Sequence, residues 1–314
     1  MPLLLLFIFS SIMFAAFLFG KSFMQDFTTI FFSIILEALP YILAGTLISS
    51  LIEVFVGADT IKKVLPRGLF PGLLLGAAAG LIFPVCECGI IPVARRLIQK
   101  GVPVPVAVSF MLATPVVNPV VLASTAAAFN DPAWALARGF LAYTIAVWCG
   151  VLVNRLASGN QLKSGGQDCG GCCAHLQEHR SGRGREVLVH AAGEFLNLSC
   201  YLIIGAFIAA AAQVAVPRHY LLAFGANPLS SCLAMMALAY GLSLCSEADA
   251  FVAATFQASF THGSILAFLL LGPMLDLKNT LMLFGTFRSR FVALISIILV
   301  LDVLAVALAV NLGG

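Results

Sequence analysis

The sequence predicts an all-α membrane protein made of two inverted repeats, each with three spans and one re-entrant or broken-helix hairpin, preceded by an extra N-terminal span. Three observations predict this fold. Of the 314 residues, 61% are hydrophobic and only 10% are charged, against roughly 25% charged residues in a soluble domain. The apolar runs are continuous rather than alternating, which is typical of spanning helices and not of strands. Motifs of the first part of the chain also recur in the second part.

This composition excludes soluble, disordered and fibrous proteins, because the mean hydropathy of +1.04 is too high for any of them. The net charge of +3 is not gathered into a basic face, so no nucleic-acid partner is expected. The expected partners are the lipid bilayer and a small inorganic or organometallic substrate. The sequence indicates no oligomeric state.

Apolar segments follow one another along the whole chain. They cover residues 3–20, 27–56, 69–84, 89–100, 104–128, 133–153, 190–216, 229–244, 250–260, 263–286 and 289–311. The first lacks a basic n-region and is expected to be a span rather than a cleaved signal. A crossing takes about 20 residues. Four segments, 69–84, 89–100, 229–244 and 250–260, are therefore too short, and they form two neighbouring pairs that predict broken helices or re-entrant hairpins.

The repeats are indicated by matching positions 158 to 160 residues apart: Tyr41–Gly45 with Tyr201–Gly205, Cys86 with Cys245, and Phe110–Pro115 with Phe268–Pro273. From these matches we expect four parts. They are an N-terminal span (1–26), a first repeat (27–156), a connecting loop (157–187) and a second repeat (188–314).

The basic residues indicate the orientation of the spans. If each short pair enters and leaves on one side, thirteen of the 17 Lys and Arg residues face the cytoplasm, while Lys21, Arg138 and Arg218 face out. Each repeat then contains three full spans. An odd number of spans gives the two repeats opposite orientations in the membrane. The N-terminus and the connecting loop are expected on the cytoplasmic side.

The first short pair is interrupted by residues 84–89, here called the first break. Its helix is expected to end because Pro84 lacks an N–H and Gly89 permits unusual dihedral angles. Cys86, Glu87 and Cys88 lie at this break. Thiolates bind soft ions such as Cu(I), Zn(II) or As(III), and a carboxylate at membrane depth can carry protons. The alternative is that the cysteines are small, tolerated residues and that Glu87 lies at an interface.

The second short pair is interrupted by residues 245–249, here called the second break. Cys245, Glu247 and Asp249 lie in it. Inverted symmetry would bring the two breaks face to face near the middle of the bilayer. The sequence therefore predicts one shared substrate or metal site whose ligands are Cys86, Glu87, Cys88, Cys245, Glu247 and Asp249.

A proline motif follows each short pair. Pro115 is followed by Asn118, and Pro273 is followed by Asp276 at the matching position. Each proline leaves the carbonyl four residues earlier without a helical donor. We expect these four residues to line the site. The alternative is a packing kink in which Asp276 pairs with Lys278 or another basic group.

The connecting loop carries a cluster of soft-metal ligands: Cys169, Cys172, Cys173, His175 and His179. Thiols and imidazoles at these spacings suit a tetrahedral metal site. The alternative is a linker with incidental cysteines. Apart from a soft metal that is transported or bound by this loop, no cofactor is expected. Elsewhere, Gly72, Gly76 and Gly80 are four residues apart and predict close helix packing.

The run Phe83–Val93, with Arg95-Arg96-Leu97 and Ser109–Pro119, resembles a bacterial predicted-permease family that includes the organoarsenical exporter ArsP and copper/zinc efflux permeases. The resemblance covers nearly the whole chain, including Ser243–Asp249. It implies a multi-pass permease of the bacterial inner membrane, with efflux of soft metals or metalloids in some relatives. The copper/zinc relatives carry Ser where this chain has Glu87.

The predicted function is a secondary transporter, not an enzyme, that exports a soft metal ion or a trivalent metalloid or organoarsenical. The acids of the two breaks, with Asp276, would bind protons or neutralise the ion. Two alternatives remain open. Cys86 and Cys245 could pass electrons across the bilayer as a thiol–disulfide conduit, or helix amino ends could serve an anion or sulfur-compound permease. The sequence has no GxxxxGK[ST] motif, so energy must come from a gradient or a partner.

Overall fold

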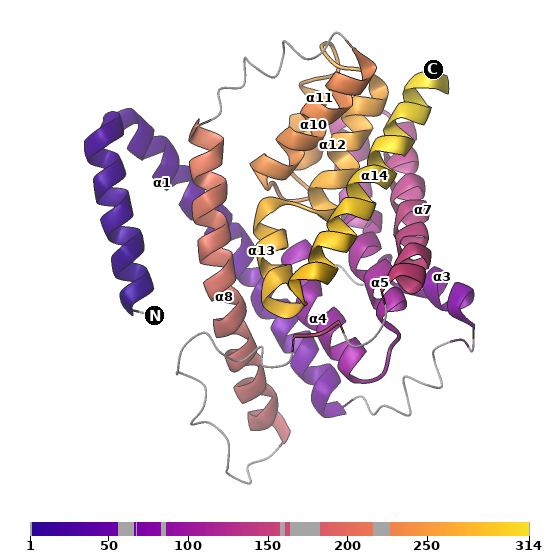
Figure 1. The fold of residues 1–314 in the computed structure, drawn as a ribbon, viewed down its shortest axis with the longest axis horizontal. Coiled ribbons are helices and arrows are strands. Elements are labelled where there is room, and N and C mark those ends of the chain that lie inside the picture. The colour runs from indigo at the N-terminus through magenta and orange to yellow at the C-terminus, as the bar shows by residue number, and fades with distance from the viewer. Residues whose placement is uncertain are drawn as a thin grey trace.

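The structure is a computed structural model that describes residues 2–55, 66, 68–82, 86–157, 161–163, 183–215 and 227–313. Within these residues the chain is helical (Figure 1). The extended pairing in this part is a single antiparallel bridge between Leu162 and Phe287. The predicted all-α class is confirmed.

We call the chain up to residue 157 the first half and the chain from residue 183 the second half. The helices of the first half are α1 (Pro2–Phe55), α3 (Leu69–Ala79), α4 (Glu87–Gln99), α5 (Val104–Val117), α6 (Pro119–Phe129) and α7 (Pro132–Leu156). Those of the second half are α8 (Arg183–Ala215), α10 (Pro228–Leu242), α11 (Asp249–Ala254), α12 (His262–Met274), α13 (Leu277–Thr286) and α14 (Ser289–Gly313).

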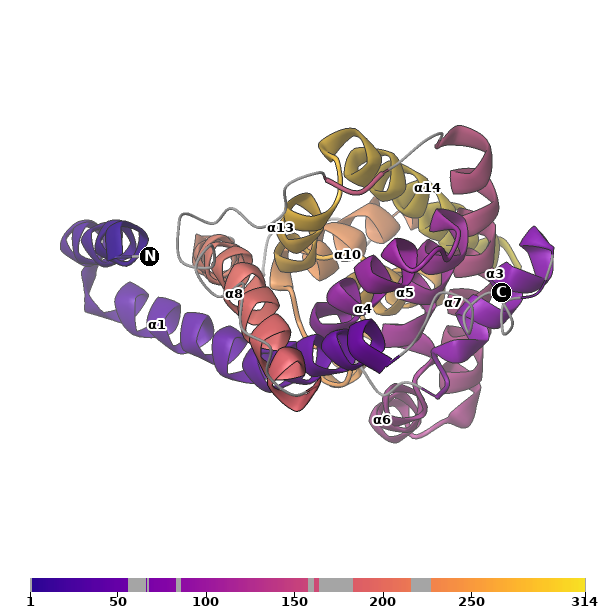
Figure 2. The same cartoon turned by 90° about the horizontal axis from the view of Figure 1, so that it is seen from below.

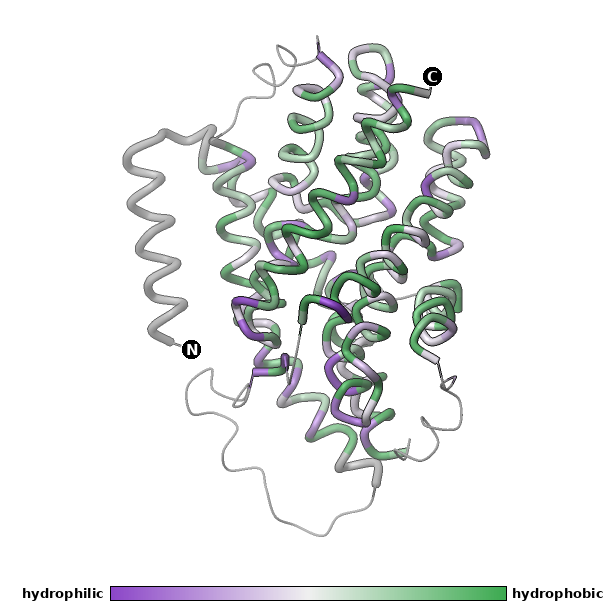
Figure 3. The backbone as a smooth tube through the Cα atoms, turned by 45° about the vertical axis from the view of Figure 1, so that its right-hand side comes forward, coloured by the Kyte–Doolittle hydropathy of each residue, from purple (hydrophilic) through white to green (hydrophobic). Residues whose placement is uncertain are grey.

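Six helical segments among the described residues are long and apolar enough to cross a membrane: Met24–Phe55, Val104–Phe129, Pro132–Leu156, Val187–Val214, His262–Thr286 and Ser289–Leu312. Figure 3 shows that these helices are hydrophobic along most of their length. The chain is therefore a multi-pass membrane protein. The opposite orientation of the two repeats stays a prediction.

Two elements differ from the prediction. α1 runs through 54 residues where two separate spans were expected. No glycine or proline lies at positions 21–26 to end the helix, and Figure 1 shows it bent into two legs. α11 has only 6 residues, and turns follow it to Ser259. There the Thr255 hydroxyl donates to the Val252 carbonyl at 2.7 Å, a side-chain bond that competes with helix propagation.

Two of the spans are broken near their middle at matching positions. α5 gives way to α6 at Asn118, whose side chain accepts a hydrogen bond from the Val120 N–H at 2.9 Å. α12 gives way to α13 at Asp276, whose side chain accepts from the Asn279 N–H at 2.6 Å. Both residues are N-caps of the second helix, which satisfies a backbone donor that the break exposes.

The long helices α1 and α8 lie side by side (Figures 1 and 2). The short helix α4 packs against α1, and the short helix α13 packs against α8. The matched glycines of these long helices make close backbone approaches to α4 and α13. A Cβ atom on Gly45 would stand 2.6 Å from the Cα of Gly89 in α4, and one on Gly205 would stand 2.9 Å from the Cα of Lys278 in α13. The glycines of the two matching Tyr-x-x-x-Gly motifs therefore let α4 pack closely on α1 and α13 pack closely on α8.

The glycine stripe of α3 packs as predicted. A Cβ atom on Gly76 would stand 2.9 Å from the Val106 carbonyl oxygen, and one on Gly80 would stand 2.7 Å from the Cα of Thr114. Gly72 contacts Val106 as well. Small residues on one face thus let α3 lie directly on α5.

Gly205→Ala is expected to lower the free energy of unfolding by about 1–3 kcal/mol, because the new methyl group would meet the backbone of Lys278. Thermal unfolding of the detergent-purified protein measures this. Gly193→Ala is the matched control, since a Cβ atom at that position in the same helix meets nothing within 4 Å. Equal melting temperatures for the two variants would contradict the close packing.

Candidate functional site

A buried lysine, Lys278 in α13, joins the two breaks. Its Nζ lies 3.0 Å from Oε1 of Glu87, the first residue of α4, and 3.4 Å from Oδ2 of Asp276. It also donates to the carbonyl oxygen of Ser243, which follows α10, at 3.0 Å. The side chains of Lys278, Glu87 and Asp276 are all at most 4% exposed. One ammonium group therefore connects the first break, the approach to the second break and the α12–α13 interruption.

Two carboxylates share this one ammonium, so the Lys278 cluster carries an excess of negative charge. Oε2 of Glu87 and Oδ2 of Asp276 are buried and receive no hydrogen bond. Taking charges out of water costs several kcal/mol per ion, and their mutual attraction offsets this only in part. Charged groups at membrane depth that face the protein interior mark substrate or ion pathways by default. We therefore take the Lys278 cluster as the centre of the candidate site.

Two thiols lie beside the Lys278 cluster. Cys86 is the half-buried N-cap of α4, and Cys88 is buried in its first turn. The two side chains are close enough to interact with each other, and Cys88 lies within electrostatic range of Lys278. Pro92 has no N–H, so the Cys88 carbonyl lacks its usual helical donor. The start of α4 thus offers two neighbouring sulfur atoms and a free carbonyl.

The second break faces the same region. Glu87 of the first break lies within electrostatic range of Cys245 in the second break. The hydroxyl of Tyr41 in α1 lies within electrostatic range of Cys86, Cys245 and Glu247. Cys245 is buried, whereas Glu247 is partly exposed. The geometry thus brings sulfur and carboxyl groups of both breaks near one another.

A second buried ion pair holds Asp249. The fully buried Arg138 of α7 places Nη2 at 2.7 Å from Oδ2 of Asp249 and at 3.3 Å from the Ser246 carbonyl oxygen. Its Nη1 donates to the Thr125 hydroxyl at 2.7 Å. Arg138 was counted among the basic residues that face out, and the structure shows that its side chain is buried in the protein interior. A carboxylate far along the sequence compensates its charge, which makes burial possible.

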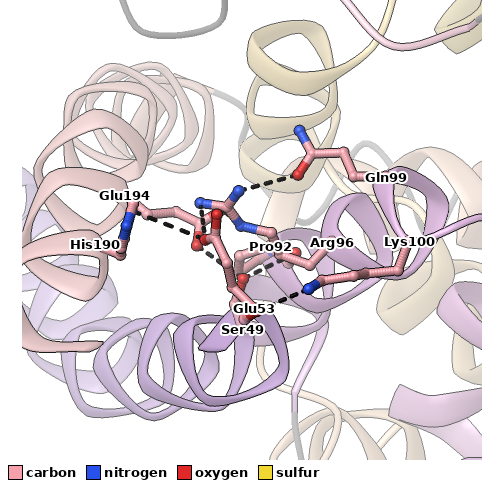
Figure 4. Close-up of polar contacts among 8 residues, drawn as sticks. All are labelled: Ser49, Glu53, Pro92, Arg96, Gln99, Lys100, His190 and Glu194. Carbon is pink, nitrogen blue, oxygen red and sulfur yellow. Dashed lines mark hydrogen bonds and ion pairs between the residues drawn. The ribbon is translucent and has the colours of Figure 1, made fainter. Parts of the chain in front are cut away.

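A polar clamp fixes α4 against both long helices (Figure 4). It consists of Ser49, Glu53, Arg96, Lys100 and Glu194. Arg96 lies 2.8 Å from Glu53 and 3.8 Å from Glu194. Ser49 donates to Glu194 at 2.8 Å, and Lys100 donates to the Glu53 carbonyl at 2.7 Å. Because the clamp holds the last turns of α4, it also determines where the first turn presents its carboxylate and thiols.

The other predicted residues take separate places. Asn118 is buried at the α5–α6 interruption, and Pro115 and Pro273 lie inside α5 and α12. The proposed loop ligands lie outside the described residues: Cys169, Cys172, Cys173, His175 and His179. In the described part of the chain, no group of three or more His, Cys, Asp or Glu side chains is arranged to hold a metal ion.

Sequence reasoning missed the roles of two cations. Lys278 was considered only as a partner of Asp276, a pairing that the 3.4 Å contact confirms, and not as the link to Glu87. Arg138 was considered only as one of the basic residues that face out, and not as the partner of Asp249. A usable signal existed, because each is a basic residue inside a long apolar segment.

Helices that span a membrane and enclose a buried charged centre are the architecture of a permease. The chain belongs to the ArsP_1 family, described as "Predicted permease", which matches residues 23–312. It is 45% identical to the UPF0718 protein YcgR of Bacillus subtilis, over 93% of this chain and 98% of that relative. It is 39% identical to the "Putative two-component membrane permease complex subunit" of Streptococcus mutans, over 84% and 87% of the two chains. No solved structure matches the chain significantly.

Lys278→Met is expected to lower the free energy of unfolding by about 3–5 kcal/mol, because it leaves Glu87 and Asp276 buried without a counter-ion. Thermal unfolding in detergent measures this loss. Adding Glu87→Gln and Asp276→Asn to Lys278→Met should recover most of it. If the triple variant melts as low as the single one, the packing of the lysine stem and not its charge holds the cluster together.

Proposed function

We propose that this permease is a secondary transporter that exports a soft metal ion or a trivalent metalloid, with a monosubstituted trivalent arsenical as the best-fitting substrate. Cys86 and Cys88 would bind it. The observation that carries this proposal is the pair of neighbouring thiols at the start of α4, beside the buried Lys278. Thiol sulfur is a soft ligand and favours soft ions over hard ones.

Two thiols suffice for such an arsenical. In R–As(OH)₂ each thiol forms one As–S bond while one As–O bond breaks, and the thiol proton leaves with the hydroxide as water, so no oxidant is needed. A structural zinc site requires four ligands, whereas the described residues hold no group of three.

Transport would follow from movement of the two halves around the site. Rocking of repeats about a central site is the general mechanism of transporters with this kind of broken helix. The first half would supply Cys86 and Cys88, and the second half would supply Cys245 and Glu247 when the halves close. We further propose that the protein lies in the bacterial inner membrane, as its bacterial relatives suggest. From the distribution of basic residues we propose that its N-terminus lies in the cytoplasm.

In cells of the source organism from which only this gene is deleted, so that any partner subunit is still present, the wild-type protein is expected to lower accumulation of a methylated trivalent arsenical. Cys86→Ser or Cys88→Ser is expected to abolish this effect by removing one As–S bond. Accumulation is measured by mass spectrometry, with inorganic arsenite, copper and zinc in parallel. Cys232→Ser is the matched control, a buried cysteine in α10 that contacts Ser264 and Asn311. Unchanged accumulation of every compound would overturn the proposal.

The name of the Streptococcus mutans relative speaks of a two-component complex. We extend this to the present chain and propose that transport requires a second membrane subunit. Purified chain in vesicles should then bind the arsenical through Cys86 and Cys88 without carrying it across the bilayer. Transport by the purified chain alone would contradict the need for a partner.

A further inference from the structure

The two buried ion pairs are arranged reciprocally between the halves of the molecule. Glu87 lies in the first break and is the first residue of α4, and its partner Lys278 belongs to the second half. Asp249 ends the second break and is the first residue of α11, and its partner Arg138 belongs to the first half. In each case the acid that begins the helix at a break is paired with a base from the opposite half.

Arg138 does more than balance the charge of Asp249. Its guanidinium group also donates hydrogen bonds to the Ser246 carbonyl inside the second break and to the Thr125 hydroxyl of α6. That hydroxyl in turn donates to the Val121 carbonyl at 2.8 Å, which fixes it against α6. A planar guanidinium held on both sides has one orientation, so it can position the backbone that it contacts.

Two cations thus bind the backbone at the second break, one just before it and one inside it. Lys278 binds the carbonyl of Ser243 on the α10 side, and Arg138 binds the carbonyl of Ser246 next to α11. Both serines are only 2% exposed. A buried carbonyl outside a helix needs a donor, and losing one costs about 1–3 kcal/mol. These donors come from α13 and α7 rather than from the segment itself.

We infer that Arg138 is a positioning residue of the transport site, which holds the second break in the conformation that presents Cys245 and Glu247 towards the first break. For its consequence in transport, this inference rests on the proposed function. The conformation of the break can be followed without any substrate, because Cys245 lies inside it and is 6% exposed.

The experiment measures the rate at which a maleimide labels Cys245 in the full-length protein that keeps this residue as its sole cysteine. Arg138→Gln is expected to raise the rate roughly tenfold or more, because the break loses two hydrogen bonds from a charged donor. Thr125→Val, which leaves both charges in place, is expected to raise it by less. Tyr143→Phe is the matched control, since it removes a 3.1 Å hydrogen bond from the same helix to Leu74 and should leave the rate unchanged.

Arg138→Gln combined with Asp249→Asn separates positioning from charge balance. The pair leaves no uncompensated charge but still deprives the Ser246 carbonyl of its donor, so labelling should stay fast. A return to the parental rate would reduce Arg138 to a counter-ion and overturn the inference. An unchanged rate in Arg138→Gln would also overturn it, and if that variant does not fold, an unchanged rate in Thr125→Val has the same meaning. Because the labelling needs no substrate, a failure of the proposed transport function leaves this readout intact.

Discussion

The contact between Lys278 and Glu87 is the interaction on which the rest of the structure depends. A charge inside a membrane protein is tolerated when an opposite charge and hydrogen-bond partners compensate it. Neither half of the chain can do this for its own break: the carboxylate of Glu87 needs α13, and the carboxylate of Asp249 needs α7. The charged groups are therefore stable only when both halves are assembled. The buried ion pairs therefore determine how the two halves fit together.

The charged groups lie at the interruptions of the broken helices, and packing against the long helices α1 and α8 fixes their positions. Asn118 and Asp276 stop one helix and cap the next, which lets two spans open their backbone near the middle. Gly45 and Gly205 let the backbones of α4 and α13 lie directly on α1 and α8. The glycines allow an approach that any side chain would prevent, so rigid backbone contacts act together with the polar clamp to position the polar groups.

The chemistry of the centre narrows the substrates that suit it. Two neighbouring thiols, an ammonium shared by two carboxylates and a third thiol nearby favour a small ligand that forms covalent bonds to sulfur. The family and its relatives establish a membrane permease. The nature of the transported compound is our proposal from the thiols of Cys86 and Cys88, since names within the family describe membrane transport without a substrate.

Composition and pattern alone determined that the chain is an all-α membrane protein, where most of its helices lie, and that polar breaks interrupt the short apolar pairs. These features are local, because hydropathy and helix-ending residues report the surroundings of a single segment. Only the tertiary structure decided that Arg138 is buried and that Lys278 binds Glu87 as well as Asp276. Arg138 and Asp249 are 111 residues apart in sequence. Whether a charge is solvated or paired depends on which distant segment meets it, and no local pattern carries that information.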